Sequence, residues 1–298
     1  MQTRSLGGTG QEVTVIGYGA MQLRGPDSMK GPRITEDRAG DVLNAVLDAG
    51  INVIDTARAY GLSEERIGRH VSHRRSEYVL ATKSHCDGGW TEANLRRELE
   101  TSLELLKTDH VDVLQLHNPT PAEVREGQLV DALHGLREEG LTRSIGISTF
   151  LPEVMEFIEM GVFETFQFPY ACLQQRHREA MERAAAAGAG IIARGAVSWG
   201  GPRVEGARSF IVSLWERAGL DEVLGDLSPG ELLIRCAISH PDCHTNVIGS
   251  TSPEHIRENV AAARKGPLPE ALLEEITGRV KAASQAILRE REAREKEN

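Results

Sequence analysis

The sequence lacks any apolar run near the roughly 20 residues that a helix needs to cross a bilayer, so we expect no membrane span. It also lacks an excess of basic charge, because 34 lysines and arginines stand against 44 aspartates and glutamates, a formal net charge of -10. Without a basic face, nucleic acid and anionic membranes are poor partners. We expect a small molecule as the partner, and the pattern leaves the oligomeric state open.

Cysteine is scarce, and none of the four cysteines belongs to a C-x-x-C pair. The start, MQTRSLGG, does not resemble a signal peptide, so we expect reduced thiols and a cytoplasmic location. One stretch brings cysteines and histidines together, namely Cys236, His240, Cys243 and His244. Such residues on a helix and at its exit pack more often than they bind metal, so we expect no metal site.

Two functional motifs are absent, one for dinucleotide binding and one for serine hydrolysis. An open dinucleotide-binding sheet carries G-x-G-x-x-G after its first strand, and the nearest stretch, GYGAMQ from Gly17, lacks the third glycine. A serine hydrolase carries G-x-S-x-G at a strand-to-helix turn, whereas GISTF around Ser148 ends in Phe150. These absences count against both classes of protein.

What the sequence contains is a regular alternation of strand and helix patterns. Two β-prone runs flank the glycines at 7–10 and predict an opening hairpin. Short apolar runs then recur at 13–19, 51–55, 78–82, 111–116, 144–148, 165–169, 190–194 and 245–249. Helical patterns lie between or after them, for example at 91–108, 121–140 and 252–266. This order predicts an α/β fold with a parallel sheet, and the missing glycine motif favours a closed barrel. No linker or repeat divides the chain, so we expect a single domain over residues 1–298.

Polar residues stand where three successive strands are expected to end. Asp55 ends the second strand with Tyr60 in the loop beyond it, Lys83 ends the third, and His117 ends the fourth. In a parallel barrel the carboxyl ends of the strands converge, so these side chains are expected to meet. Each is ordinary alone, because a lysine there is usually a loop charge and a histidine usually structural.

Together the four residues form a coherent chemical device. A phenol has a pKa of about 10, so a tyrosine exchanges protons poorly at neutral pH unless a cation favours its phenolate. Lys83 can supply that cation, and Asp55 can balance and orient the ammonium. His117 can hydrogen-bond a substrate oxygen or relay a proton to the phenol. Such an acid suits carbonyl reduction, in which a hydride arrives at carbon as a proton arrives at oxygen.

The stretches DTARAYG, ATK and LQLHN, in that order, resemble the aldo-keto reductase superfamily. The resemblance extends over nearly the whole chain, from LGGTGQEVTVIGYGAM to VIGSTSPEHIREN. It implies a (β/α)8 TIM barrel with an N-terminal β-hairpin and an NAD(P)-dependent oxidoreductase that acts on an aldehyde, a ketone or the matching alcohol. It also implies Asp55, Tyr60, Lys83 and His117 as the catalytic tetrad, with Tyr60 as the general acid in reduction.

The same resemblance implies cofactor contacts at the strand ends. Gly19 and Met21 follow the first barrel strand, and Ser148 and Gln167 match the residues that bind the nicotinamide carboxamide. Thr149 replaces the usual asparagine beside the serine, and a hydroxyl makes only part of an amide's hydrogen bonds. Arg194 stands where many members have an aromatic residue on the nicotinamide. A guanidinium can also stack there, although its charge disfavours the oxidised ring, and a salt bridge at the barrel rim is the alternative.

The end of the chain bears on the choice between NADP(H) and NAD(H), because a 2′-phosphate needs cationic donors. The family often has a lysine or arginine where Gly249, Ser250 and Thr251 stand, and an arginine at His255. Hydroxyls, backbone amides and the helix after Ser252 can still bind phosphate, with His255 contributing when protonated. Glu258 and Asn259 match adenine contacts. We expect NADP(H), with NAD(H) as the alternative.

Loops over the barrel mouth determine the substrate in this superfamily. The segment 195–210 is rich in glycine and contains Trp199, which fits either a mobile lid or a long surface loop. Trp90 and His85 can line the pocket or pack, and we favour packing for Trp90. The charged end, 287–298, predicts a solvated helix that does not cover the mouth. A regulatory subunit that binds the cofactor with little turnover is the alternative to an enzyme.

Overall fold

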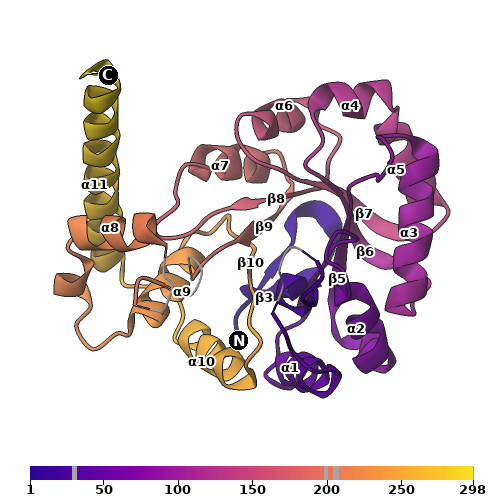
Figure 1. The fold of residues 1–298 in the computed structure, drawn as a ribbon, viewed down its shortest axis with the longest axis horizontal. Coiled ribbons are helices and arrows are strands. Elements are labelled where there is room, and N and C mark those ends of the chain that lie inside the picture. The colour runs from indigo at the N-terminus through magenta and orange to yellow at the C-terminus, as the bar shows by residue number, and fades with distance from the viewer. Residues whose placement is uncertain (29–31, 198–200, 204–207, 298) are drawn as a thin grey trace.

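The computed structural model describes residues 1–28, 32–197, 201–203 and 208–297. Eight parallel strands pair in the order β10-β3-β4-β5-β6-β7-β8-β9 and close into a barrel (Figure 1). They are β3 (Ile16–Gly19), β4 (Val53–Asp55), β5 (Val79–Ser84), β6 (Val111–His117), β7 (Thr142–Ser148), β8 (Thr165–Pro169), β9 (Gly190–Arg194) and β10 (Thr245–Ile248). The closed TIM barrel is confirmed.

Helices cover the outside of the barrel (Figure 1). They are α1 (Glu36–Asp48), α2 (Ser63–His70), α3 (Glu92–Leu106), α4 (Pro121–Glu126), α5 (Leu129–Glu138), α6 (Glu153–Met160), α7 (Arg178–Ala186), α9 (Pro229–Ser239) and α10 (Pro253–Arg264). Short 3-10 turns lie at η2 (Ala20–Leu23) and η3 (Ser72–Glu77). Hydroxyl side chains accept a backbone N–H at several helix starts and so stabilise these ends, namely Thr35, Thr91, Thr120, Ser228 and Ser252.

The helical pattern predicted over 121–140 is present as two helices, because the chain breaks between α4 and α5. Gln128 adopts a left-handed conformation with φ of 51°. A Cβ on Gly127 would lie 2.1 Å from the backbone oxygen of Trp90. The periodicity predicted both helices, but this close approach of a distant segment decided the break between them.

The N-terminal hairpin closes the end of the barrel at which the strands begin. Strands β1 (Thr3–Ser5) and β2 (Glu12–Thr14) pair antiparallel, with the turn η1 (Gly7–Thr9) between them. Leu6 is fully buried in a cluster with apolar side chains from five barrel strands. A Cβ on Gly190 would lie 2.7 Å from the Leu6 side chain, so this strand needs glycine where the plug enters. The predicted hairpin is therefore confirmed, and it acts as the floor of the barrel.

A second, smaller apolar cluster lies beside the barrel. It is formed mainly by α8 (Ser209–Arg217), η5 (Leu220–Val223), one face of α9 and the long helix α11 (Glu270–Glu297). In Figure 1, α11 stands with α8 at the edge of the molecule opposite α3, away from the barrel strands. An ion pair of 2.6 Å between Arg217 and Glu290 joins the two helices. No helix in the described part of the chain has the length and hydropathy of a membrane span.

Candidate active site

A buried ion pair lies where β4 and β5 end. The Lys83 ammonium donates hydrogen bonds to Asp55 Oδ2 and to the Thr56 carbonyl, both at 2.7 Å. Lys83 is 1% exposed and Asp55 4%. Because charges at this depth are costly unless paired, each residue balances the buried charge of the other.

Tyr60 lies against this pair. The Lys83 ammonium is 5.1 Å from the centroid of the Tyr60 ring, and the His117 ring meets the same ring edge-on at 5.8 Å between centroids. All four side chains of the expected tetrad are thus in one cluster. The Lys83 ammonium lies over the face of the Tyr60 ring, where the electron-rich π-system attracts a cation.

The loop that carries Tyr60 is anchored by a buried glutamate that sequence reasoning missed. Glu64 is fully buried and accepts hydrogen bonds from Arg58 and from Thr82 Oγ1, both at 2.6 Å. The Arg58 N–H also donates to the Lys83 carbonyl at 2.9 Å. These contacts tie both ends of the loop to β5. No signal in the sequence distinguishes Glu64 from an ordinary acidic residue in a first helical turn.

His117 is neutral at physiological pH. Burial, assisted by the charges of Lys83, Arg194 and His85, lowers its pKa from 6.5 to about 3. A neutral imidazole has one N–H donor and one acceptor nitrogen. His117 can therefore donate a hydrogen bond at the barrel mouth without adding a positive charge.

Two expected cofactor residues are connected to the tetrad. Gln167 Nε2 donates to Asp55 Oδ1 at 2.8 Å, and Ser148 Oγ donates to Gln167 Oε1 at 2.9 Å. The Gln167 amide retains a further N–H and a further lone pair for another ligand, and the Ser148 oxygen retains its lone pairs. Gln115, which sequence reasoning missed, lies two residues before His117 on the interior face of β6. Its amide nitrogen is 3.5 Å from Asp55 Oδ1, at the long limit of a hydrogen bond.

Arg194 ends β9 and faces the same cluster. Its guanidinium lies 4.6 Å from the centroid of the Phe150 ring, a contact absent from the sequence-based expectations. Burial lowers the pKa of Arg194, while the charges of Tyr60 and Asp55 raise it. Within the described part of the chain the Arg194 guanidinium forms no hydrogen bond and no salt bridge, so the alternative of a rim salt bridge has no support. A half-buried guanidinium with free donors suits a planar or anionic ligand.

The remaining expected cofactor residues follow the adjacent strand ends and α10. Gly19 pairs with Asp55 across β3 and β4, and Met21 lies in η2. Tyr18 Oη donates to the Ser250 carbonyl at 2.8 Å, which holds the segment after β10 against β3. Thr149 is buried after β7, whereas His255 and Glu258 are exposed on α10 and Asn259 is half-buried there. The contacts bring the tetrad, Ser148, Gln167 and Arg194 together, while the α10 residues lie farther along.

A carboxylate holds the loop after Lys83. Glu98, only 5% exposed, accepts hydrogen bonds from Ser84 Oγ at 2.5 Å and from the backbone N–H of His85, Cys86 and Asp87 at 3.1, 3.1 and 2.6 Å. Potential ligand atoms of His85, Asp87 and Glu98 lie within 4.8 Å of one another. Because these four donors already occupy the Glu98 oxygens, the cluster suits a loop anchor better than a metal site.

Other side chains considered from the sequence lie in packing roles or outside the described residues. Trp90 packs against the main apolar core, as we favoured. His244 accepts a hydrogen bond from the Ile191 N–H at 2.8 Å, and Arg4 donates to the Cys243 and His240 carbonyls at 2.5 and 2.7 Å. Trp199 and much of the proposed lid lie outside the described residues.

Comparisons with known proteins agree on one family. The model described as the aldo/keto reductase family matches residues 15–211. An uncharacterised oxidoreductase of Bacillus subtilis, YqkF, is 28% identical over 296 residues, which cover 91% of this chain and 94% of the relative. L-galactose dehydrogenase of Arabidopsis thaliana is 32% identical over 168 residues, 53% of this chain and 51% of that enzyme. The holo-form structure of aldo-keto reductase AKR11C1 from Bacillus halodurans superimposes with a TM-score of 0.81 at 28% identity, covering 94% of this chain and 96% of that one.

Proposed function

The chain belongs to the aldo/keto reductase family of NAD(P)-dependent oxidoreductases, and from this premise we propose that it reduces an aldehyde or ketone to an alcohol with Tyr60 as the proton donor. The observation that carries the proposal is the buried Lys83–Asp55 pair against the Tyr60 ring. It supplies the fixed cation that a phenol needs to act as an acid near neutral pH.

Each tetrad residue has a separate task. Tyr60 gives its hydroxyl proton to the carbonyl oxygen, and Lys83 stabilises the phenolate that remains. Asp55 balances and orients the Lys83 ammonium through its 2.7 Å contact. Neutral His117 donates an N–H hydrogen bond to the same substrate oxygen and fixes the carbonyl over the site. In the reverse direction Tyr60, as a phenolate, would accept the hydroxyl proton of the alcohol, and the hydride would pass from the alcohol carbon to the oxidised cofactor.

The donor set at the mouth fits a nicotinamide cofactor. When bound, the reduced cofactor supplies the hydride for the carbonyl carbon. Ser148 and Gln167 retain hydrogen-bonding capacity for the carboxamide, and Thr149 lies beside them. The Arg194 guanidinium would stack on the ring in place of an aromatic residue and disfavour its positive, oxidised form, so the site would bind the reduced cofactor in preference to the oxidised one.

The residues that would hold the rest of the cofactor follow the ends of β3 and β10 and continue onto α10. They are Gly19, Met21, Gly249 and Ser250 at the strand ends, and His255, Glu258 and Asn259 on α10 for its adenosine end. We propose NADP(H) as the preferred cofactor, with NAD(H) as the alternative.

The test is a Tyr60→Phe variant assayed for oxidation of NADPH and NADH with an activated aromatic aldehyde. We expect turnover to fall by at least about a thousandfold, because the acid is lost, while the dissociation constant of the cofactor changes little. Tyr78→Phe is the matched control, since Tyr78 precedes β5 at the opposite end of the barrel. Full turnover in Tyr60→Phe would refute the role of Tyr60. Tight cofactor binding without turnover in the wild type would indicate a regulatory protein instead.

A further inference from the structure

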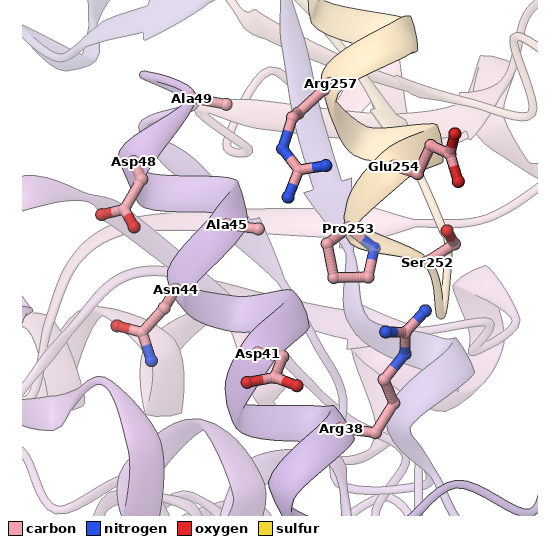
Figure 2. A pocket seen from close by; sticks show the side chains of 10 residues that line it. All are labelled: Arg38, Asp41, Asn44, Ala45, Asp48, Ala49, Ser252, Pro253, Glu254 and Arg257. Carbon is pink, nitrogen blue, oxygen red and sulfur yellow. The ribbon is translucent and has the colours of Figure 1, made fainter.

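A groove of about 690 Å³ lies on the outer face of the barrel, between α1 and α10. Figure 2 shows its walls: α1 contributes Arg38 and the small side chains of Ala45 and Ala49, and α10 contributes Pro253 and Arg257. The tetrad is not part of its lining. The groove begins beside the segment that follows β10.

Two guanidinium groups face one another in this groove. Arg38 extends from α1 toward Ser252 and Pro253, and Arg257 extends from α10 toward the same gap (Figure 2). In the part of the chain that the structure describes, neither side chain forms an ion pair, and the Arg38 side chain makes one hydrogen bond, to a carbonyl. The two cations thus have most of their donors free.

The acidic residues of the groove do not neutralise these cations. Asp48 is paired with Arg74 at 2.7 Å. Glu254 points away from the gap in Figure 2. Asp41 lies beside Arg38 on α1 without an ion pair to it, so it lowers the positive potential but leaves the donors of Arg38 available.

The one hydrogen bond of the Arg38 guanidinium places this side chain beside the segment after β10 that is proposed to bind the cofactor. Arg38 Nε donates to the Thr251 carbonyl at 3.0 Å. Thr251 belongs to the segment Gly249–Thr251, which has hydroxyls but lacks the lysine or arginine common at this place in the family. We propose that Arg38 supplies this missing cation from α1 and, with Arg257, recognises the 2′-phosphate of NADP(H). The inference rests on the proposed function and names the residues that select its cofactor.

The chemistry of the two groups supports this assignment. A phosphate monoester carries about -1.5 to -2 charge near pH 7, and a guanidinium binds two of its oxygens with a matched pair of donors. NADH has a hydroxyl at this position and gains little from the arginines. A charge-assisted hydrogen bond at a partly exposed site accounts for roughly a tenfold change in affinity.

The experiment compares nucleotide binding to wild type, Arg38→Ala and Arg38→Ala/Arg257→Ala, by titration of NADPH and NADH fluorescence and by calorimetry with 2′,5′-ADP. The matched control is Arg264→Ala, since Arg264 also joins the two helices, from α10 to the Ala49 carbonyl, at the other end of the groove. These arginines are exposed, and thermal melting of each variant verifies its fold. Inorganic phosphate serves as a competitor that lacks the nucleotide.

We expect Arg38→Ala to weaken the binding of NADPH and of 2′,5′-ADP about tenfold and to leave the binding of NADH unchanged. In the double variant the binding of NADPH and 2′,5′-ADP should be weaker still. Asp41→Asn should strengthen NADPH alone. Unchanged NADPH affinity in Arg38→Ala would overturn the inference and leave the reductase intact, as would equal affinity of wild type for NADPH and NADH. Phosphate binding that depends on both arginines but does not compete with NADPH would also overturn it, by revealing a separate anion site. Binding of neither nucleotide would overturn the proposed function as well.

Discussion

Replacing His117 by Gln tests whether this imidazole is held neutral inside the barrel. The folded protein lowers the His117 pKa from 6.5 to about 3, mainly through burial. Between these two values the unfolded chain binds a proton that the folded chain excludes, so the free energy of unfolding decreases as the pH falls below 6.5. The stability is fully present above pH 6.5 and is lost progressively toward pH 3.

The size of the effect follows from the shift. At pH 5 the unfolded side chain is about 1.5 pH units below its own pKa, which at 1.36 kcal/mol per unit corresponds to about 2 kcal/mol of lost stability. The Gln side chain does not titrate, so the variant should lose about 2 kcal/mol less than the wild type between pH 8 and pH 5. Other acid-sensitive groups, such as His177, contribute to both proteins and cancel in the difference.

The measurement is urea unfolding of both proteins at pH 8, 6.5 and 5, followed by circular dichroism. The difference between the two unfolding free energies at each pH isolates His117. Equal pH dependence in the two proteins would refute the neutral histidine and, with it, the assignment of His117 as an uncharged hydrogen-bond donor. If His117 stays neutral, its titration adds no step near pH 6.5 to the pH profile of aldehyde reduction. Any step that the wild type shows there should therefore also be present in the variant.

Three further changes have defined outcomes. Lys83→Met should abolish reduction and lower the free energy of unfolding by about 3 to 5 kcal/mol, since it leaves the Asp55 carboxylate buried without its cation; a loss below about 1 kcal/mol in urea unfolding would contradict this. Arg194→Gln should strengthen NADP⁺ relative to NADPH, because a like charge beside the oxidised ring is removed; an unchanged ratio of dissociation constants argues against stacking. Gly190→Ala should destabilise the protein by about 1 to 3 kcal/mol, because its Cβ would meet Leu6 at 2.7 Å, and a melting temperature equal to that of wild type would show that the plug can move.

Strand periodicity and strand ends were readable from the sequence because they are local. Apolar runs alternate with amphipathic helices, and in a parallel barrel this order brings Asp55, Lys83 and His117 to one rim whatever the details of packing. Tyr60 follows from its place in the loop after Asp55. The chain order therefore determined the fold, and it determined that the four residues of the expected tetrad lie on one side of the barrel.

Only the tertiary structure decided the contacts between segments far apart in the chain. It placed Gln167 on Asp55, Phe150 on Arg194, and Glu98 under the loop after Lys83. It divided the predicted helix at 121–140 where the chain approaches Trp90.

The position of Arg38 is the clearest of these cases. Arg38 lies 213 positions along the chain from Thr251, whose carbonyl it contacts. Sequence patterns report local periodicity and the types of residue at strand ends, so they revealed that the segment proposed to bind the cofactor lacks a cation. The barrel closes by pairing its first and last strands, and this closure brings α1 against α10. The physical proximity of the two ends of the chain, which no local pattern encodes, placed a cation beside that segment.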